Sequence, residues 1–235
     1  MKTIPITKMI TAYEFEELTP YLTYVYTIKQ HDTIFVIDSF CGSYYMDQIK
    51  AQYPNHKFIL INTHYHFDHI WGNYSFKENK IIAHQLCKEM ILLHGKQELH
   101  EQLDYFKGKQ ELYLPNHCFD GKLYSIENLQ LWHTPGHTID SISIYDTVSK
   151  HLFVGDSLEK PLVQTNLHFL QEHIKSLDFY LSLDFKQIHA GHTLSLDKED
   201  IRKTRDYLLK LKNDTPLTFD DEYIQSIHEM NLHNS

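Results

Sequence analysis

The sequence contains no long hydrophobic run. Nowhere in its 235 residues do about 18 apolar residues follow one another, the length at which a segment is read as membrane-spanning. The N-terminal segment MKTIPITKMITAYEFEELTP also lacks the apolar stretch of a secretory signal peptide. We therefore expect a soluble chain without a membrane partner, located in the cytoplasm.

Cysteine is scarce, and its spacing forms no motif. The three cysteines are Cys41, Cys87 and Cys118, and none belongs to a CxxC or CxH pair. An odd and widely spaced set argues against a disulfide framework. The pattern predicts reduced thiols in a reducing compartment.

Basic residues are outnumbered by acidic ones. The chain has 22 lysines and arginines against 31 aspartates and glutamates, which gives a formal net charge of −9 with histidine neutral. A surface that follows nucleic-acid phosphates carries the opposite sign. We therefore expect no nucleic-acid partner.

Linkers, internal repeats and low-complexity segments are also missing. The 8 glycines and 7 prolines do not gather into a flexible boundary between regions. A chain of this length can bury roughly 70% of its unfolded surface, so its core needs no disulfide or structural metal. The economical prediction is a single domain over residues 1–235, built from packed layers of sheet and helix.

Strand hairpins and helices alternate in two similar halves. The continuously apolar segment KFILIN at residues 57–62 is typical of a buried strand in a layered α/β protein. The last 20 residues form either one more helix or a partly ordered tail. Strands are expected over 21–28, 33–38, 57–62, 81–84, 122–126, 129–133, 141–147, 151–154 and 187–190, and helices over 43–53, 85–107, 168–183 and 197–212.

Histidine is abundant, with 18 residues, and several of these lie in tight local patterns. The segment NTHYHFDHIWGN at residues 62–73 follows the buried strand and places His64, His66, Asp68 and His69 within six residues. Imidazole suits zinc and its neighbours, and a carboxylate adds charge and can bind or orient water. Four such groups in HxHxDH order predict a metal site.

Three further candidates follow strand-like segments in the same way. His137 lies in HTPGHT, Asp156 in LFVGDS and His192 in IHAGHT. Loops at strand ends hold ligands on a rigid sheet while leaving them open to substrate. Alone, Asp156 would be interpreted as a turn residue, but its place between the two histidine motifs favours a ligand.

These motifs resemble the metallo-β-lactamase superfamily, and the resemblance extends from the VIDSF segment at residues 36–40 to AGHT at residues 190–193. It implies an α/β fold, an αββα four-layer sandwich of two mixed β-sheets flanked by helices. It also implies two metal ions per chain. Zinc is the expected metal, and iron and manganese are alternatives. By this resemblance, the first ion binds His64, His66 and His137, the second binds Asp68, His69 and His192, and Asp156 bridges both.

Differences from individual branches of the family narrow the range of expected substrates. Members that cleave β-lactams carry cysteine or serine where Asp156 stands, so that activity is not expected. Acyl-homoserine lactonases carry a tyrosine where Glu159 stands, and the residues after His192 are too few for the thioester-binding domain of glyoxalase II. The resemblance favours a small-molecule ester, thioester, lactone or phosphodiester, and leaves these four open.

The expected mechanism needs no serine or cysteine nucleophile. Two divalent ions lower the pKa of a shared water to about neutrality, and the resulting hydroxide attacks a carbonyl or phosphoryl centre. Asp68 is the expected catalytic residue, because its carboxylate can accept a hydrogen bond from the nucleophile as well as ligate.

Two other functional classes stay open. One is an iron-dependent sulfur dioxygenase or other redox enzyme on the same fold, since similar ligands hold iron. The other is a non-catalytic metal-binding protein. The sequence also leaves open a homodimer. The aromatic segment between the halves could form a substrate lid, or equally serve ordinary core packing or a dimer contact; its residues are Tyr105, Phe106, Tyr113, His117 and Phe119.

The groups around the ligands have weaker expectations. Asp38 is expected to cap a turn or support a ligating histidine rather than bind metal. Hydroxyls at Thr63, Thr138, Ser157 and Thr193 are candidates for the same role. His84 is expected to be structural, and most other histidines, His173 among them, are expected at surface or packing positions.

Overall fold

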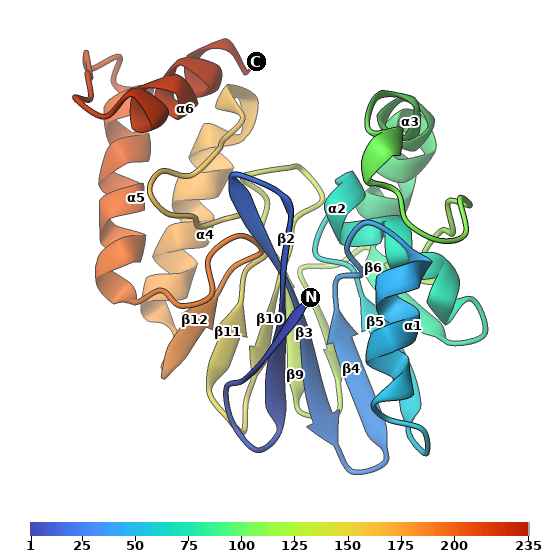
Figure 1. Ribbon diagram of the computed structural model, residues 1–235. Coiled ribbons are helices and arrows are strands. Elements are labelled where there is room, and N and C mark those ends of the chain that lie inside the picture. Colours follow the sequence, from blue (N-terminus) through green and yellow to red (C-terminus); the bar gives the residue numbers. More distant parts are fainter. Residues whose placement is uncertain (235) are drawn as a thin grey trace. The chain divides into compact units, whose positions relative to one another are not determined.

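The chain forms two mixed β-sheets flanked by helices in the computed structural model, which describes residues 1–234 (Figure 1). It divides into two compact units, Met1–Asp120 and a second unit that begins at Gly121. Each unit contains one sheet with its own helices and its own apolar core. The expected α/β class is confirmed, and the single domain over 1–235 stays a prediction.

The first unit is built on a seven-stranded sheet in sequence order. Strands up to β4 pair antiparallel, and those from β4 onward pair parallel. The sheet therefore changes from hairpin connections to helical crossovers at β4. The strands are β1 (Lys2–Pro5), β2 (Ile10–Leu18), β3 (Tyr21–Gln30), β4 (Thr33–Ile37), β5 (Lys57–Ile61), β6 (Lys80–His84) and β7 (His117–Phe119).

Three of these strands, β1, β2 and β7, were not predicted from the sequence. The segment of β2 carries three glutamates and shows no alternation of buried and exposed side chains, because the four consecutive residues Ala12 to Phe15 are all buried. One of them, Glu14, is buried because its carboxylate accepts hydrogen bonds from Lys2 Nζ and from the Tyr24 hydroxyl, both at 2.9 Å. Contacts between neighbouring strands thus satisfy the Glu14 carboxylate, which the local sequence pattern would predict to be exposed.

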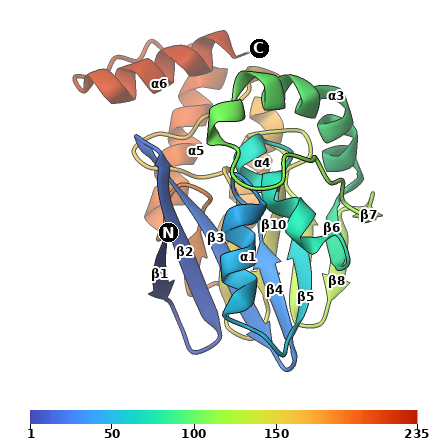
Figure 2. The same ribbon diagram turned by 45° about the vertical axis from the view of Figure 1, so that its right-hand side comes forward.

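Helices of the first unit follow the parallel strands. They are α1 (Ser43–Ala51), α2 (Phe67–Ile70), α3 (Gln85–Glu101) and the 3₁₀ segments η1 (Trp71–Phe76) and η2 (Leu103–Tyr105). The predicted helix over 85–107 is therefore shorter, with η2 following it. Helix α1 ends ahead of Pro54, as predicted, and covers one face of the sheet (Figure 2), where Met46 and Ile49 pack against Val36 and Leu60.

The second unit is built on a five-stranded sheet in the order β12-β11-β10-β9-β8. Its strands are β8 (Leu123–Ile126), β9 (Leu129–His133), β10 (Ile142–Asp146), β11 (His151–Phe153) and β12 (Gln187–His189). Only β11 and β12 pair parallel; the others pair antiparallel. All five were predicted, with ends that differ by a few residues.

Helices α4 (Leu170–Ser182) and α5 (Lys198–Lys212) lie side by side in the second unit (Figure 1) and share an apolar core with β11 and β12. The 3₁₀ turn η3 (Leu167–Phe169) precedes α4, and α6 (Glu222–His233) ends the described chain. The C-terminal segment is thus a helix, one of the two alternatives predicted. Asp197 begins α5 with a capping box that includes Asp200.

Candidate metal centre

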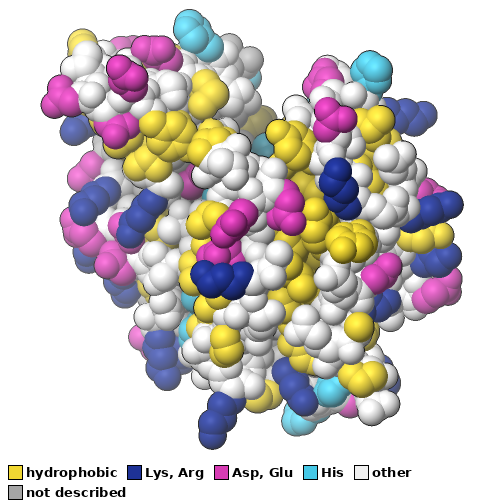
Figure 3. Space-filling view, viewed as in Figure 1, with side chains coloured by type: hydrophobic (Ala, Val, Ile, Leu, Met, Phe, Trp, Pro, Cys, Tyr) yellow, Lys and Arg dark blue, Asp and Glu magenta, His cyan; other side chains and the backbone are white. Residues whose placement is uncertain are grey.

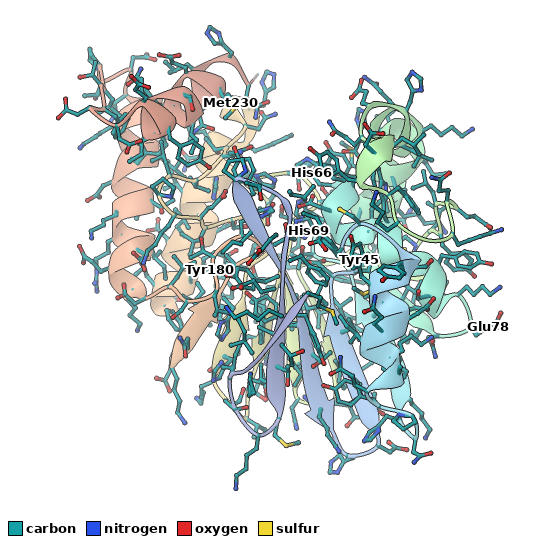
Figure 4. All side chains as sticks on the ribbon, viewed as in Figure 1. Tyr45, His66, His69, Glu78, Tyr180 and Met230 are labelled. Atoms are coloured by element: carbon teal, nitrogen blue, oxygen red, sulfur yellow. The ribbon has the colours of Figure 1, made fainter. Side chains whose placement is uncertain are left out.

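The four ligand candidates of the first unit lie within six consecutive residues shortly after β5. His64 is in the connection from β5, His66 is the residue that precedes α2, and Asp68 and His69 belong to α2. The sequence predicted a loop here, whereas the structure has a one-turn helix after His66. Figure 4 shows His66 and His69 at the end of the sheet where β4 and β5 finish.

Asp38 orients the His69 ring through a hydrogen bond. Its carboxylate accepts hydrogen bonds from the Thr63 amide at 2.7 Å, the Thr63 hydroxyl at 2.8 Å and His69 Nδ1 at 2.8 Å. Because Nδ1–H of His69 donates to Asp38, Nε2 is the nitrogen that faces the Asp68 carboxylate, at 3.5 Å. This arrangement agrees with the supporting role predicted for Asp38.

Backbone strain and burial mark the Asp38 position. Its φ is +63°, in the left-handed region that few residues other than glycine, asparagine and aspartate adopt. Complete burial raises the pKa of the Asp38 carboxyl, and the His69 imidazole and Thr63 oppose that shift. A strained and buried carboxylate is maintained here because three hydrogen bonds satisfy it.

His64 and His66 face one another through ring nitrogens. His64 Nδ1 lies 3.1 Å from the Thr63 hydroxyl, and His64 Nε2 lies 3.1 Å from His66 Nδ1. Beneath them, Asn62 Nδ2 donates to the His69 carbonyl at 3.1 Å and to Asn73 Oδ1 at 3.0 Å. The loop that carries all four candidates is therefore held by buried polar contacts, and Asn73 was not singled out from the sequence.

The three candidates of the second unit come from three different connections. His137 follows β9, Asp156 follows β11 and His192 follows β12. Asp156 Oδ2 lies 3.1 Å from His192 Nε2 and 3.8 Å from His137 Nε2. One carboxylate oxygen thus faces a ring nitrogen of each histidine, and the structure brings together the three residues that the sequence placed at strand ends.

His137 takes its orientation from a backbone carbonyl. Its Nδ1–H donates to the Gln164 carbonyl oxygen at 3.1 Å, which directs Nε2 towards Asp156. A hydrogen bond of this kind selects the tautomer and the ring plane of a metal-binding histidine. Gln164 could not be identified from the sequence, because it acts through its backbone and lies 27 residues away.

His173 supports two of the second unit's connections and was expected only at a packing or surface position. It is fully buried, donates from Nε2 to the Ser157 carbonyl at 2.8 Å, and accepts at Nδ1 from the Thr165 hydroxyl at 3.0 Å. Burial lowers the pKa of His173 to about 4. A side chain at Gly136 would place its Cβ 2.5 Å from the His173 ring, so the glycine of HTPGHT was the available signal.

The predicted supporting hydroxyls have local partners. Thr138 Oγ1 lies 2.7 Å from Ser141 Oγ within the turn after β9, and Thr193 Oγ1 accepts a hydrogen bond from the Lys160 amide at 3.0 Å. His84 ends β6, and its Nδ1 accepts the Leu86 amide at 3.3 Å at the start of α3, so its predicted structural role is confirmed.

The aromatic segment considered as a lid contributes mainly to the first unit's core. Phe106 is buried and its ring centroid lies 4.9 Å from that of Trp71, while the Tyr113 hydroxyl donates to the Lys77 carbonyl at 3.1 Å. Tyr105 differs, because 38% of its surface is exposed. Ordinary packing therefore accounts for Phe106, and a lid role stays a prediction for the other four residues of the segment.

The donor chemistry fits divalent metal ions. All seven candidates offer imidazole nitrogen or carboxylate oxygen, and their exposure ranges from fully buried to half-buried. In each unit one histidine has Nδ1 engaged by Asp38 or Gln164, so Nε2 remains for a metal. A nitrogen and oxygen set without thiolate suits zinc, iron and manganese.

Comparisons with known proteins give the family. The family model of the metallo-beta-lactamase superfamily matches residues 18–215. A hydroxyacylglutathione hydrolase from Pelagibacter ubique is 28% identical over 106 residues, which are 44% of this chain and 37% of that protein. A beta-lactamase-like protein 2 homolog from Caenorhabditis elegans is 26% identical over 168 residues, 69% of this chain and 51% of that protein.

Solved structures agree in fold. The metallo-beta-lactamase FIM-1 from Pseudomonas aeruginosa, in a mono-zinc form, has a TM-score of 0.72 at 15% identity and covers 89% of this chain and 95% of its own. The chain spans only about a third to a half of the length of the two curated relatives. Because the family model extends over most of the sequence, including every ligand candidate, the chain belongs to the metallo-beta-lactamase superfamily.

Proposed function

We propose that this protein is a metal-dependent hydrolase with two zinc ions per chain. His64, His66 and His137 would hold the first ion, Asp68, His69 and His192 the second, and Asp156 would bridge both. The observation that carries the proposal is that each unit orients one histidine with its Nε2 left for ligation: Asp38 orients His69, and the Gln164 carbonyl orients His137. Family membership supports combining the two sets.

The proposed chemistry divides between ions and side chains. When bound, the ions lower the pKa of a shared water to near neutrality and polarise the electrophilic oxygen of the substrate. Asp68 accepts a hydrogen bond from that water through a carboxylate oxygen and so orients it for attack. Asp38 holds His69 in the tautomer that leaves Nε2 for ligation, and its negative charge stabilises the imidazole.

The substrate class is a small-molecule ester, thioester, lactone or phosphodiester. The hydrolase relative named for hydroxyacylglutathione supports the thioester. On the face shown in Figure 3, basic and acidic side chains intermingle over α5, which fits a protein without a nucleic-acid surface there. No helix of the described residues is long and apolar enough to cross a membrane, and a cytoplasmic location stays a prediction.

Metal analysis followed by a substrate panel tests the proposal. Purified protein should carry close to two equivalents of zinc and hydrolyse at least one of the four substrate classes, and a chelator should abolish turnover. One equivalent of iron with oxygen consumption on a sulfur substrate would instead assign the redox alternative. Protein that binds metal but turns over none of the panel would favour the non-catalytic alternative.

β-Lactams form the matched negative control. Aspartate stands at position 156, where the resemblance places cysteine or serine in lactam-cleaving members, so we expect no efficient penicillin or carbapenem hydrolysis. A kcat/KM on the order of 10⁴ M⁻¹s⁻¹ or more, the lower end of the usual enzymatic range, would contradict this assignment.

A further inference from the structure

The helix α6 reaches back to the segment that orients His137. Asn231 lies on α6, and only 1% of its surface is exposed. Its side chain contacts the chain at residues 163–165, 66 to 68 positions earlier in the sequence. Asparagine is seldom fully buried unless its amide is satisfied, so this contact has a specific polar purpose.

The Asn231 amide binds the backbone on both sides of Gln164. Its Nδ2 donates to the Val163 carbonyl at 2.8 Å, and its Oδ1 accepts the Thr165 amide at 2.9 Å. The peptide groups before and after Gln164 are therefore held by one rigid side chain. Between them, the Gln164 carbonyl accepts Nδ1–H of His137 at 3.1 Å.

The remaining hydrogen of the Asn231 amide is paired with a tyrosine on α5. The second hydrogen of Asn231 Nδ2 is donated to the Tyr207 hydroxyl at 3.0 Å, and Tyr207 lies 3.0 Å from Nδ1 of His228. A reversed amide would place its oxygen against the Val163 carbonyl and its NH₂ against the Thr165 amide. The observed orientation is therefore the one in which every contact pairs a donor with an acceptor.

A second residue extends the same attachment. Asn234 Nδ2 donates to the Thr165 carbonyl at 3.2 Å, and the Leu167 amide donates to the Asn234 carbonyl at 2.9 Å. The Thr165 hydroxyl in turn contacts His173, which donates to the carbonyl of Ser157, beside Asp156. Residues 163–165 thus connect α6 to the connections that carry His137 and Asp156.

Docking of a helix does not by itself need these contacts. Ile227 of the same helix is buried at 1% exposure, and apolar burial of that kind is enough to attach a helix. A buried amide is costly unless each group is paired, so its presence specifies geometry more than it adds attraction. The geometry it specifies is that of the Gln164 carbonyl.

We propose that Asn231 is a positioning residue for His137: by clamping the peptide groups on either side of Gln164, it fixes the carbonyl that selects the ring plane and the Nδ1–H tautomer of this histidine. The clamp itself is a property of the folded chain, and its value for metal binding rests on the proposed function. Without it, the carbonyl loses its fixed direction, and His137 presents either nitrogen.

Metal-free protein provides the first test. The tautomer of His137 is read from ¹H–¹⁵N spectra of the ring nitrogens, assigned with a His137→Gln variant, at about pH 8.5, where a free imidazole is neutral. Wild-type protein and Ile227→Ala should show the Nδ1–H form of His137. Asn231→Ala should show a mixture, or a shift towards Nε2–H. An unchanged tautomer in folded Asn231→Ala would overturn the proposal.

Zinc affinity, measured by competition with a chelator, is the second readout. Loss of a partner that orients a metal ligand typically weakens binding about 10–100-fold, so Asn231→Ala should fall in this range and Ile227→Ala should stay near wild type. Equal losses in both variants would show that α6 acts only through stability. If wild-type protein binds no zinc, the proposed function fails, while the tautomer still decides the role of Asn231.

Milder variants keep the test decisive where Asn231→Ala does not fold. Asn231→Asp retains the acceptor for the Thr165 amide but cannot donate to Val163. Tyr207→Phe retains both backbone contacts and removes only the acceptor of the second amide hydrogen. We expect tautomer mixing to be larger in Asn231→Asp than in Tyr207→Phe. The reverse order, or wild-type spectra in both, would refute the clamp.

Discussion

The two units orient their ligand candidates by different means. In the first, a buried carboxylate, Asp38, accepts the ring proton of His69. In the second, a neutral backbone carbonyl at Gln164 accepts the ring proton of His137. The first arrangement is charge-assisted and stronger per bond, whereas the second adds no charge to a site that already contains Asp156.

The supports also differ in how far they reach along the chain. Those of the first unit lie within a continuous stretch from Asp38 to Asn73, on consecutive elements of one sheet. Those of the second come from α4 and α6, through His173 and Asn231, and depend on helices docked over other connections. The first set should therefore be robust to changes elsewhere, and the second should respond to the packing of its own helices.

The largest effect is expected at Asp156, the only carboxylate among the three ligand candidates of the second unit (the second set). Asp156→Ala removes the anion that faces both His137 and His192. If it also bridges two ions, their repulsion rises in a partly desolvated site, so we expect loss of at least one metal equivalent. Turnover should fall by more than about 100-fold, because losing a proposed ligand costs more than the roughly 10–100-fold loss of a group that orients one. Elemental analysis and kcat/KM measure both.

His192→Ala is the matched variant for this experiment. It removes one ligand but keeps the carboxylate, so it should mainly weaken the second ion and retain the first. Circular dichroism should show both variants folded, because the two apolar cores do not include these residues. Two metals and near-normal turnover in Asp156→Ala would make Asp156 a turn residue and would remove the bridging role from the proposal.

The next largest effect is expected at acidic pH, where the second unit should lose stability before the first. Burial lowers the pKa of His173 and of His189 to about 4 in the folded second unit, from an ordinary value of 6.5. The unfolded chain binds these protons first, so stability is complete above pH 6.5 and is lost as the pH falls towards 4. Each histidine contributes roughly 3 kcal/mol to that loss. Urea unfolding of metal-free protein between pH 7.5 and 4.5 measures the slope.

A substitution separates this effect from general acid denaturation. His189→Gln removes one titrating group, so its stability should change less steeply over the same pH range than that of wild type, by up to one proton. Hydrogen exchange at pH 5 should show earlier opening in residues 121–234 than in 1–120, where the buried His69 is paired with Asp38. Equal pH slopes for variant and wild type would remove His189 from this account.

The same contrast explains what could be predicted from the sequence. His64, His66, Asp68 and His69 were found because they share one short segment, and Asp38 because it directly follows β4. The other ligand candidates were identified because strand ends and turns flank them. Gln164, His173 and Asn231 were missed, since their roles come from contacts formed only after helices dock, through backbone groups that have no residue signature.

The fold was predictable to a similar extent and for a similar reason. Strong apolar segments such as that of β5 identify themselves, whereas β1, β2 and β7 become strands through pairing with their neighbours. The helix α2 is a single turn, too short for a periodic pattern to reveal. The local sequence pattern therefore identified the elements whose own residues favour a strand or a helix, and missed those that depend on contacts with their neighbours.

Asp38→Asn tests the charge in the first unit's support. Asparagine tolerates the positive φ and keeps an oxygen for the Thr63 amide, so the backbone should be preserved. The amide Nδ2 then replaces the oxygen that accepts from His69 Nδ1–H, so this hydrogen bond is lost and zinc affinity should fall about 10–100-fold. Competition with a chelator measures this change, with Thr63→Ser, which keeps the hydroxyl, as control. A wild-type affinity would show that the Asp38 carboxylate is not needed to orient His69.

The smallest effect is expected from the cap of α5, which tests whether stability alone alters the second ligand set. Asp197 accepts the amides of Glu199 at 2.7 Å and Asp200 at 3.0 Å, and is exposed. Asp197→Ala should cost about 1 kcal/mol of unfolding free energy, the usual value for a lost N-cap. Zinc affinity should not change, because no ligand candidate contacts the cap. Urea unfolding and chelator competition on the same preparation give both quantities. A loss of affinity comparable with that of Asn231→Ala would mean that the second set follows the overall stability of its unit, and the distinction between a specific clamp and general packing would not hold.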